Sequence, residues 1–176
     1  MKGYITILFI VIIQLNMNAQ SWKTPTIEGY GRIVEYDNVA IKPDSTAHYK
    51  LFFNITTDKE REGVNVSLWK MARIINLLEN GGVPKNNIHI GGVVSGPAAL
   101  IVLSKDAYFK KTGEANPNLD LIEKLATYGT TLHFCGQAAA EKNIDPEKDL
   151  NSHFTLTLSA LVDIPTYEMQ GYSIIY

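Results

Sequence analysis

One side chain in this sequence is an obvious candidate for covalent chemistry, the single cysteine at position 135. It lies in residues 130–143, TTLHFCGQAAAEKN, where an extended apolar segment (130–134) runs into Cys135, Gly136 and the helix-forming residues 137–142. A strand, a tight turn and a helix start would place the sulfur at the carboxyl end of a strand, where open α/β sheets carry their ligand sites. Free N–H groups and the helix dipole favour an anion there, so a thiolate or a persulfide would be stabilised.

A purely structural role for this cysteine is the alternative, because a lone cysteine is often a small buried hydrophobic residue that closes a strand. His133 lies two residues earlier on the same side of the strand, about 6.5 Å away along the backbone. That spacing is too long for a direct bond to Cys135 without side-chain reach. We therefore interpret His133 as a hydrogen-bonded structural histidine.

Several kinds of site lack their sequence patterns. The four histidines show no paired metal-ligand spacing and no second cysteine joins them, so we expect no metal. Neither G-x-G-x-x-G nor G-x-x-x-x-G-K-[ST] occurs, so we expect no dinucleotide or nucleoside triphosphate cofactor. With 16 basic and 18 acidic residues well mixed and a net charge of −2, no basic stripe offers a surface for nucleic acid or for an anionic membrane.

The first nineteen residues have the pattern of a signal peptide. Lys2 supplies a positive start, residues 5–15 an apolar stretch and residues 17–19 a cleavage site before Gln20. The apolar stretch is too short to span a bilayer, although a retained membrane anchor is the alternative. No cysteine lies near the cleavage site, so a bacterial lipoprotein is not indicated. We expect the mature protein to lie outside the cytoplasm, either periplasmic or secreted, where a free thiol calls for an explanation.

Alternating strand and helix patterns organise the rest of the chain. Residues 20–48 are polar and predict an N-terminal arm with an extended piece at 31–36. Apolar runs predict strands at 49–56, 88–94, 130–134, 154–158 and 172–176. Helices are expected from Val64 to the glycines at 81–82, from Pro97 onward, from a cap at Asn116 to residue 128, at 137–142 and at 159–170, the last interrupted or restarted at Pro165. This alternation predicts right-handed βαβ units and a mainly parallel sheet of about five strands with helices on both faces.

Five short segments, taken in order, give the chain a resemblance to a known family. They are residues 93–98 (VVSGPA), 116–119 (NPNL), 134–137 (FCGQ), 159–161 (SAL) and 170–172 (QGY). From residue 49 to the end, the chain resembles the DsrE/DsrF-like family of sulfur-relay proteins. The resemblance implies a three-layer α/β/α fold for residues 49–176, assembly into homo-oligomers (trimers or hexamers), and a cysteine that carries sulfane sulfur as a persulfide.

By position that cysteine is Cys135, and the expected supporting residues are Gly136, Gln137, Ser95 and Gly96. Many relatives have a histidine where this chain has Ser95. The signal peptide separates this chain from the cytoplasmic relays that serve tRNA thiolation, so a tRNA role does not carry over.

Two functions follow as hypotheses. The first is a sulfur-carrier or sulfurtransferase-like protein with Cys135 as acceptor, partnered by a sulfur donor or acceptor protein or by a small sulfur compound. The second is a non-catalytic oligomeric binding protein in which Cys135 only packs.

Overall fold

The computed structural model describes residues 21–176, so the expected signal peptide at 1–19 lies outside the described residues. Within this range the fold is built on a sheet of five strands in the order β6-β5-β4-β1-β7, and every neighbouring pair is parallel. The strands are β1 (Tyr49–Ile55), β4 (Ile88–Val94), β5 (Thr131–Cys135), β6 (Phe154–Thr157) and β7 (Ser173–Ile175). The predicted class, an α/β sandwich on a mainly parallel sheet, is confirmed.

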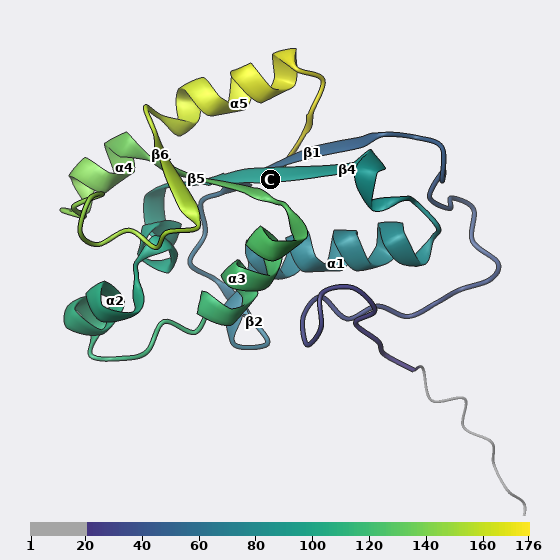
Figure 1. Ribbon diagram of the computed structural model, residues 1–176, viewed down its shortest axis with the longest axis horizontal. Coiled ribbons are helices and arrows are strands. Elements are labelled where there is room, and N and C mark those ends of the chain that lie inside the picture. Colours follow the sequence, from purple (N-terminus) through teal and green to yellow (C-terminus); the bar gives the residue numbers. More distant parts are fainter. Residues whose placement is uncertain (1–20) are drawn as a thin grey trace, which may run out of the picture.

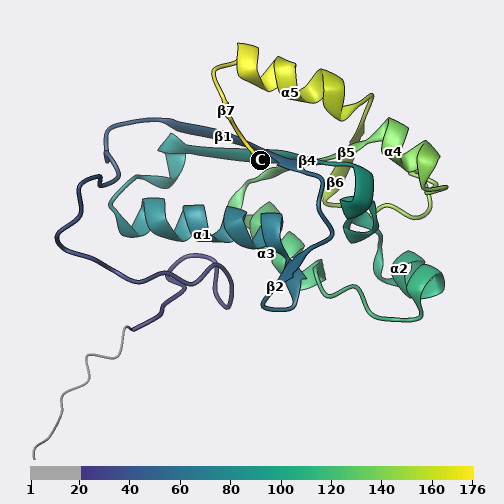
Figure 2. The ribbon, with the colours of Figure 1, turned by 180° about the vertical axis from the view of Figure 1, so that it is seen from behind.

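Helices cover both faces of this sheet (Figures 1 and 2). They are α1 (Val66–Asn80), α2 (Lys105–Thr112), α3 (Leu119–Tyr128), α4 (Gly136–Glu141) and α5 (Ala160–Met169). Helices α1 and α3 pack against each other below the sheet in Figure 1, whereas α5 crosses above it and contacts β1, β4 and β7. A short antiparallel hairpin, β2 (Glu60–Arg61) and β3 (Val64–Asn65), leads into α1.

The two central strands owe their close packing to a pair of glycines. β1 and β4 pair over seven residues each, and Gly91 and Gly92 lie opposite Phe52 and Phe53. A methyl group at Gly91 would lie only 3.1 Å from the Phe52 ring. That ring stacks on Tyr167 of α5, with 3.8 Å between the ring centroids. Small residues in β4 therefore let large aromatic side chains fill the interface between the sheet and α5.

One buried side chain makes four of the hydrogen bonds that attach the N-terminal arm to the domain. Asn76 of α1 is fully buried, and its Oδ1 accepts hydrogen bonds from the backbone N–H groups of Thr26 and Ile27. Its Nδ2 donates to the backbone carbonyls of Tyr30 and Gly31. The extended piece expected at 31–36 is reduced to one bridge, between Lys23 and Ile33. The arm is thus held by side-chain hydrogen bonds rather than by a strand.

The segment after β4 differs from the predicted helix. Residues 96–102 form a 3-10 helix, η2 (Gly96–Val102), and the separate helix α2 follows with Ser104 as its cap. The Nδ2 group of Asn116 donates to the carbonyls of Ile101 and Leu103, which ties down the end of η2. Since these carbonyls are used by a side chain, the segment does not continue as an α-helix.

The same asparagine explains why the next helix starts late. Asn116 was the predicted cap, but α3 begins at Leu119, with Asn118 before it. The Oδ1 atom of Asn116 accepts from the backbone N–H of Asn118, which makes a turn ahead of the helix. A second short 3-10 helix, η1 (Lys85–Asn87), precedes β4.

The last helix continues through its proline. Pro165 was expected to interrupt or restart it, but α5 runs through Pro165 as one helix from Ala160 to Met169. The hydroxyl of Thr166 donates to the carbonyl of Val162, 2.7 Å away, next to the place where the proline lacks an N–H. Within residues 21–176, no helix has the length and apolarity needed to cross a membrane.

Candidate functional site

Cys135 lies at the carboxyl edge of the parallel sheet, as its sequence context predicts. It is the last residue of β5 and the residue that precedes the first turn of α4. The register between β4 and β5 pairs Val94 with Phe134, so Ser95 and Gly96 leave the sheet at the same edge. The side chain of Cys135 is buried, with 5% of the residue exposed. The thiol therefore lies just beneath the surface at the place where α/β sheets bind ligands.

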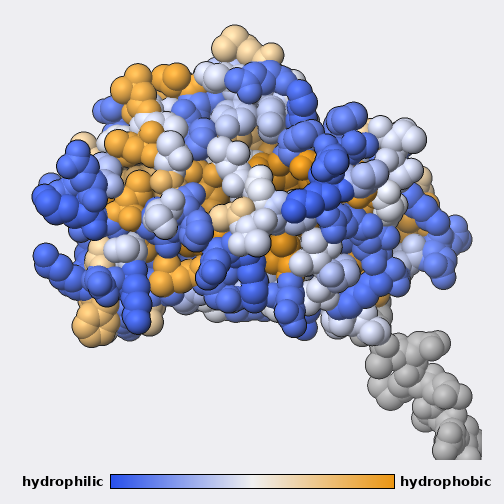
Figure 3. Space-filling view, viewed as in Figure 1, coloured by the Kyte–Doolittle hydropathy of each residue, from blue (hydrophilic) through white to orange (hydrophobic). Residues whose placement is uncertain are grey.

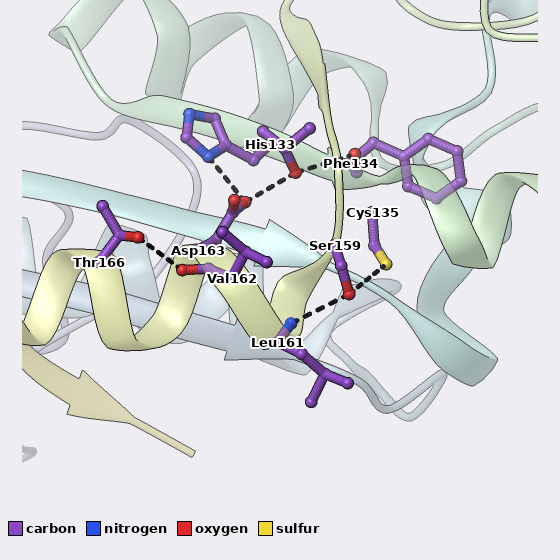
Figure 4. A network of polar contacts seen from close by, with 9 residues as sticks. His133, Phe134, Cys135, Ser159, Leu161, Val162, Asp163 and Thr166 are labelled. Carbon is purple, nitrogen blue, oxygen red and sulfur yellow. Dashed lines mark hydrogen bonds and ion pairs between the residues drawn. The ribbon is translucent and has the colours of Figure 1, made fainter.

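The polar partner of the sulfur comes from a different part of the chain. Sγ of Cys135 lies 4.0 Å from Oγ of Ser159, the residue that caps α5 (Figure 4). Oγ of Ser159 accepts a hydrogen bond from the backbone N–H of Leu161 and a long one from the Cys135 thiol. The sulfur thus lies at the N-terminal end of a ten-residue helix, where the helix dipole favours negative charge.

Gly136 supplies a close approach between two segments. A methyl group built at Gly136 would lie 2.8 Å from the carbonyl oxygen of Thr157 and 3.3 Å from that of Leu158. No other residue type fits there without a shift of the backbone. Glycine at this position therefore lets the end of β6 pass directly over the start of α4, next to the sulfur.

Gln137 holds the same two segments together. Its Nε2 group donates to the carbonyl of Leu158 over 3.1 Å. Helix α4 has only six residues, and the side chain of Cys135 makes no capping hydrogen bond to it. Gly136 and Gln137 thus shape the connection from β6 to α5, which carries Ser159 to the sulfur.

The other two predicted supporting residues reach the same edge without touching the thiol. Ser95 donates its backbone N–H to the carbonyl of Ile55, which fixes the end of β4 against β1. Gly96 has φ of +57°, a left-handed conformation that glycine adopts without strain. Among the described residues, neither forms a hydrogen bond to Cys135.

His133 is bonded within the fold, as its sequence context suggests. Its Nδ1 atom lies 3.0 Å from Oδ2 of Asp163 in the first turn of α5, and the same carboxylate oxygen accepts from the hydroxyl of Thr157 over 2.7 Å (Figure 4). Tyr167 packs edge-on against the imidazole, with 5.7 Å between centroids, and burial raises the pKa of its hydroxyl. This network fixes the start of α5 over β5, and so fixes the position of Ser159.

The surface beside the thiol is unusually apolar. Four large apolar residues at the end of β6 and the start of α5 are exposed: Leu156 (44%), Leu158 (70%), Leu161 (85%) and Val162 (47%). We refer to these four residues as the apolar rim. In Figure 3, hydrophobic side chains gather at the upper left, over the end of the molecule where β6, α4 and the start of α5 lie. Exposed apolar side chains that are adjacent in this way mark a contact surface more often than an ordinary solvent face.

Ser159, Asp163 and Thr157 were not among the candidate site residues. Serine before an apolar helix is a common N-cap, and aspartate in the first turn of a helix is also common, so local sequence explains both without a site. Their proximity to Cys135 and His133 follows only from the crossing of α5 over β5. Within residues 21–176, no group of three or more His, Cys, Asp or Glu side chains is arranged to hold a metal ion.

Comparison with known proteins agrees with this geometry. The family model for the DsrE/DsrF-like family matches residues 50–176. Among solved structures, a protein of unknown function from Methanobacterium thermoautotrophicum, MTH1491, is similar to this chain with a TM-score of 0.52 and 18% identity. The match covers 72% of this chain and 97% of that one, and at this identity it supports the fold alone. No curated protein matches the sequence. The family match covers more than half of the chain, and the protein belongs to the DsrE/DsrF-like family.

Proposed function

We propose that this protein is a sulfur carrier in which Cys135 holds sulfane sulfur as a persulfide. The observation that carries the proposal is the contact between Sγ of Cys135 and Oγ of Ser159, 4.0 Å apart, at the N-terminal end of α5. Once the sulfur carries a negative charge, the Ser159 hydroxyl can turn to donate to it, and the positive end of the α5 dipole lies beside it. Membership of a family of sulfur-relay proteins supports the same chemistry.

The transfer step is an exchange between a thiol and a persulfide. The Cys135 thiolate, its proton lost to solvent, attacks the outer sulfur of a donor persulfide. The sulfur–sulfur bond of the donor breaks as the new bond to Cys135 forms, and the donor leaves as a thiolate. No electrons are gained or lost overall, so the step needs no cofactor. Attack by an acceptor thiolate on the outer sulfur of Cys135 releases the cargo by the same exchange.

The burial of the thiol favours a second function. Cys135 is 5% exposed, and a cysteine this buried can have a purely structural role. In that case the protein would be a non-catalytic oligomeric binding protein. The two functions differ in thiol reactivity, because a carrier must admit a donor to the sulfur whereas a packing residue stays unreactive in the folded protein.

The test compares the native protein with Cys135→Ser and with Ser159→Ala. Each is incubated with glutathione persulfide, desalted, and assayed for cyanide-labile sulfur and for intact mass. We expect the native protein to gain one sulfur, Cys135→Ser to gain none while it keeps its thermal unfolding midpoint, and Ser159→Ala to load more slowly. A native protein that loads no sulfur, with a thiol unreactive until the protein unfolds, would establish the packing role.

Export is part of the proposal. We propose that residues 1–19 are a signal peptide and that the carrier works outside the cytoplasm, with a sulfur donor or acceptor protein or a small sulfur compound as partner. The basis is the charge and apolar pattern of the first nineteen residues. N-terminal sequencing of the protein recovered from its host should start near Gln20, and an intact Met1 in the membrane fraction would contradict export.

A further inference from the structure

An apolar groove that does not include Cys135 lies beside α1, on the opposite face of the sheet from α5. It encloses about 400 Å³ and its lining is almost wholly apolar. Its lining residues come from β1, β7 and α1: Tyr49, Leu51, Phe53, Ile175, Lys70, Arg73, Ile74 and Leu77. The volume falls in the range of roughly 300–1,000 Å³ that is typical of small-molecule sites.

The groove exists because the helix layer on this face is incomplete. Helix α1 packs against β1 and β4 with α3 beside it, while β7 forms the edge of the sheet beyond β1 (Figure 2). Parallel sheets are normally covered by helices on both faces, and their strands are apolar on both sides. Here no helix fully covers Leu51 and Ile175, which lie half-buried on this face beside the buried Phe53. The uncovered position keeps the apolar character of a buried one.

One cationic side chain, Lys70, lies at the rim of this apolar floor, whereas the guanidinium of Arg73 is turned to Trp69, 4.0 Å from the ring centroid. Lys70, Arg73, Ile74 and Leu77 follow one another at helical spacing on α1 and form one wall of the groove. Lys70 is exposed, and no ion pair or hydrogen bond engages it within the described part of the chain. Arg73 donates two hydrogen bonds to the carbonyl of Arg32 and keeps its positive charge.

No acidic residue lines the groove to balance these charges. The nearby carboxylate of Glu62 is occupied by Arg32 and by the indole N–H of Trp69. A twofold contact between two copies through this groove would bring the Lys70 and Arg73 side chains of both copies toward each other with no acid between them. Like charges facing each other oppose a twofold contact here, and a head-to-tail contact through the groove is distinguished below by the effect of Leu77→Ser on the assembled mass.

We propose that the groove binds a small amphiphile with an anionic head group and a saturated hydrocarbon chain. The chain lies on Leu51, Phe53 and Ile175 against Ile74 and Leu77, and the head group faces Lys70 at the rim. Apolar contact supplies the affinity, and the lysine selects the sign of the head group. This site is separate from the sulfur chemistry proposed for Cys135.

The test uses dodecanoate below its micelle concentration as the probe, measured by isothermal titration calorimetry with the full protein. We expect one molecule to bind per chain, and decanoate to bind more weakly, by up to about fourfold for each methylene removed. Dodecyltrimethylammonium, which has the same chain and the opposite charge, should bind much more weakly. Cys135→Ser should bind dodecanoate as the native protein does.

Two variants and a matched control locate the site. Lys70→Glu should weaken dodecanoate binding by about three- to tenfold and improve binding of the cationic amphiphile. Leu77→Ser should weaken binding of dodecanoate and of the cationic amphiphile alike. Lys105→Glu, an equal charge change on α2, should alter the binding of neither compound. Absence of binding, or equal affinity in Lys70→Glu and the native protein, would overturn the proposal. If Leu77→Ser instead lowers the mass seen by light scattering while dodecanoate does not bind, a second copy fills the groove.

Discussion

Gly136 sets how closely the β6–α5 connection can approach the sulfur. A methyl group there would lie 2.8 Å from the carbonyl oxygen of Thr157, an atom held in the backbone of the neighbouring segment. The clash between this methyl group and the carbonyl oxygen can be relieved only by a backbone shift. Shifts of this kind typically cost about 1–3 kcal/mol. We expect Gly136→Ala to lower the free energy of unfolding by that amount in urea denaturation and to slow sulfur loading. The control is Gln137→Ala, which removes one exposed hydrogen bond and should change stability by less than about 0.5 kcal/mol. Equal stability of Gly136→Ala and the native protein would show that the connection yields easily.

Ser159 combines a structural task with a chemical one. Its hydroxyl caps α5 through the N–H of Leu161 and also faces the sulfur. We expect Ser159→Ala to destabilise the protein by about 1 kcal/mol, the usual cost of a lost cap, and also to reduce the rate at which the thiol reacts with a neutral disulfide at pH 7.

Ser104→Ala separates these two effects. Ser104 caps α2 by accepting from the N–H of Ala107, and no contact joins it to Cys135. We expect this variant to lose similar stability and to keep the native thiol rate. If the two variants show the same thiol rate, Ser159 acts only as a cap.

Helix α1 holds the N-terminal arm through Asn76, which makes four hydrogen bonds to the arm from a fully buried position. Asn76→Ala removes the partner of two N–H groups and two carbonyls at once. Each unpaired buried group costs about 1–3 kcal/mol, although water can rescue some of them after the arm moves. We expect a loss of at least about 2 kcal/mol, with faster amide exchange and proteolysis at residues 24–33. Asn80→Ala, which loses one exposed hydrogen bond to Glu35, should leave the free energy of unfolding, the amide exchange and the proteolysis nearly unchanged.

Helix α3 carries an ion pair between Lys124 and Asp120 that responds to pH, and both residues also bond to the arm, at Glu28 and Tyr30. A hydrogen bond from Lys124, 2.8 Å away, holds the pKa of Asp120 below its ordinary value, and a bond from the Tyr30 hydroxyl adds to the shift. Because the pKa is lower in the folded protein, the contribution is present above the unfolded value near 3.9 and is lost as pH falls through the folded value. The pair is exposed, so the contribution is at most about 1 kcal/mol.

The lowered pKa of Asp120 in the folded protein predicts how the stability of Asp120→Asn depends on pH. The variant should be less stable than the native protein at pH 7, and the difference should shrink toward zero as pH falls below 4. Urea midpoints measured from pH 7 to pH 3 give the comparison. Glu123→Gln removes one charge from the same helix without removing the Asp120 contacts and serves as the control. A difference that grows on acidification would contradict the assignment.

The molecule as a whole offers surfaces that suit assembly. The apolar rim is exposed beside the thiol, and both edge strands, β6 and β7, have one unpaired side. Together with the family membership, these features lead us to propose a closed homo-oligomer, a trimer or larger, in which the rim is buried. Light scattering at micromolar concentration should give that mass for the native protein, and a monomer would contradict it.

Substitutions on α5 test which surface is used. Leu161→Glu places a charge in the apolar rim and should lower the mass toward that of one chain. Met169→Glu makes the same kind of change at the other end of α5, where the residue is 81% exposed, and should leave the mass unchanged. If both variants assemble normally, the contact lies elsewhere.

Much of this fold follows from short-range information. The strands start at or within one residue of their predicted positions, and Cys135 lies at a strand end, because apolar runs and glycine boundaries act over a few residues. Alternation of strands and helices also favours a parallel sheet, since a crossover helix returns the chain in the same direction. The predicted helices differ from the observed ones at η2, at α2 and at the start of α3. These differences arise where Asn116 bonds to carbonyls 13 and 15 residues away.

The site itself depended on long-range packing. Cys135 and Ser159 are 24 residues apart, and His133 and Asp163 are 30 apart, so no local pattern relates them. They meet because α5 crosses β1 and β4 on the face opposite α1 and brings its first turn over the end of β5. Asn76 is likewise an ordinary polar residue of an amphipathic helix until the arm, 45 to 50 residues away, packs on it. The sequence specifies which side chains are available, and the energetics of packing the helices on the sheet determine which of them touch.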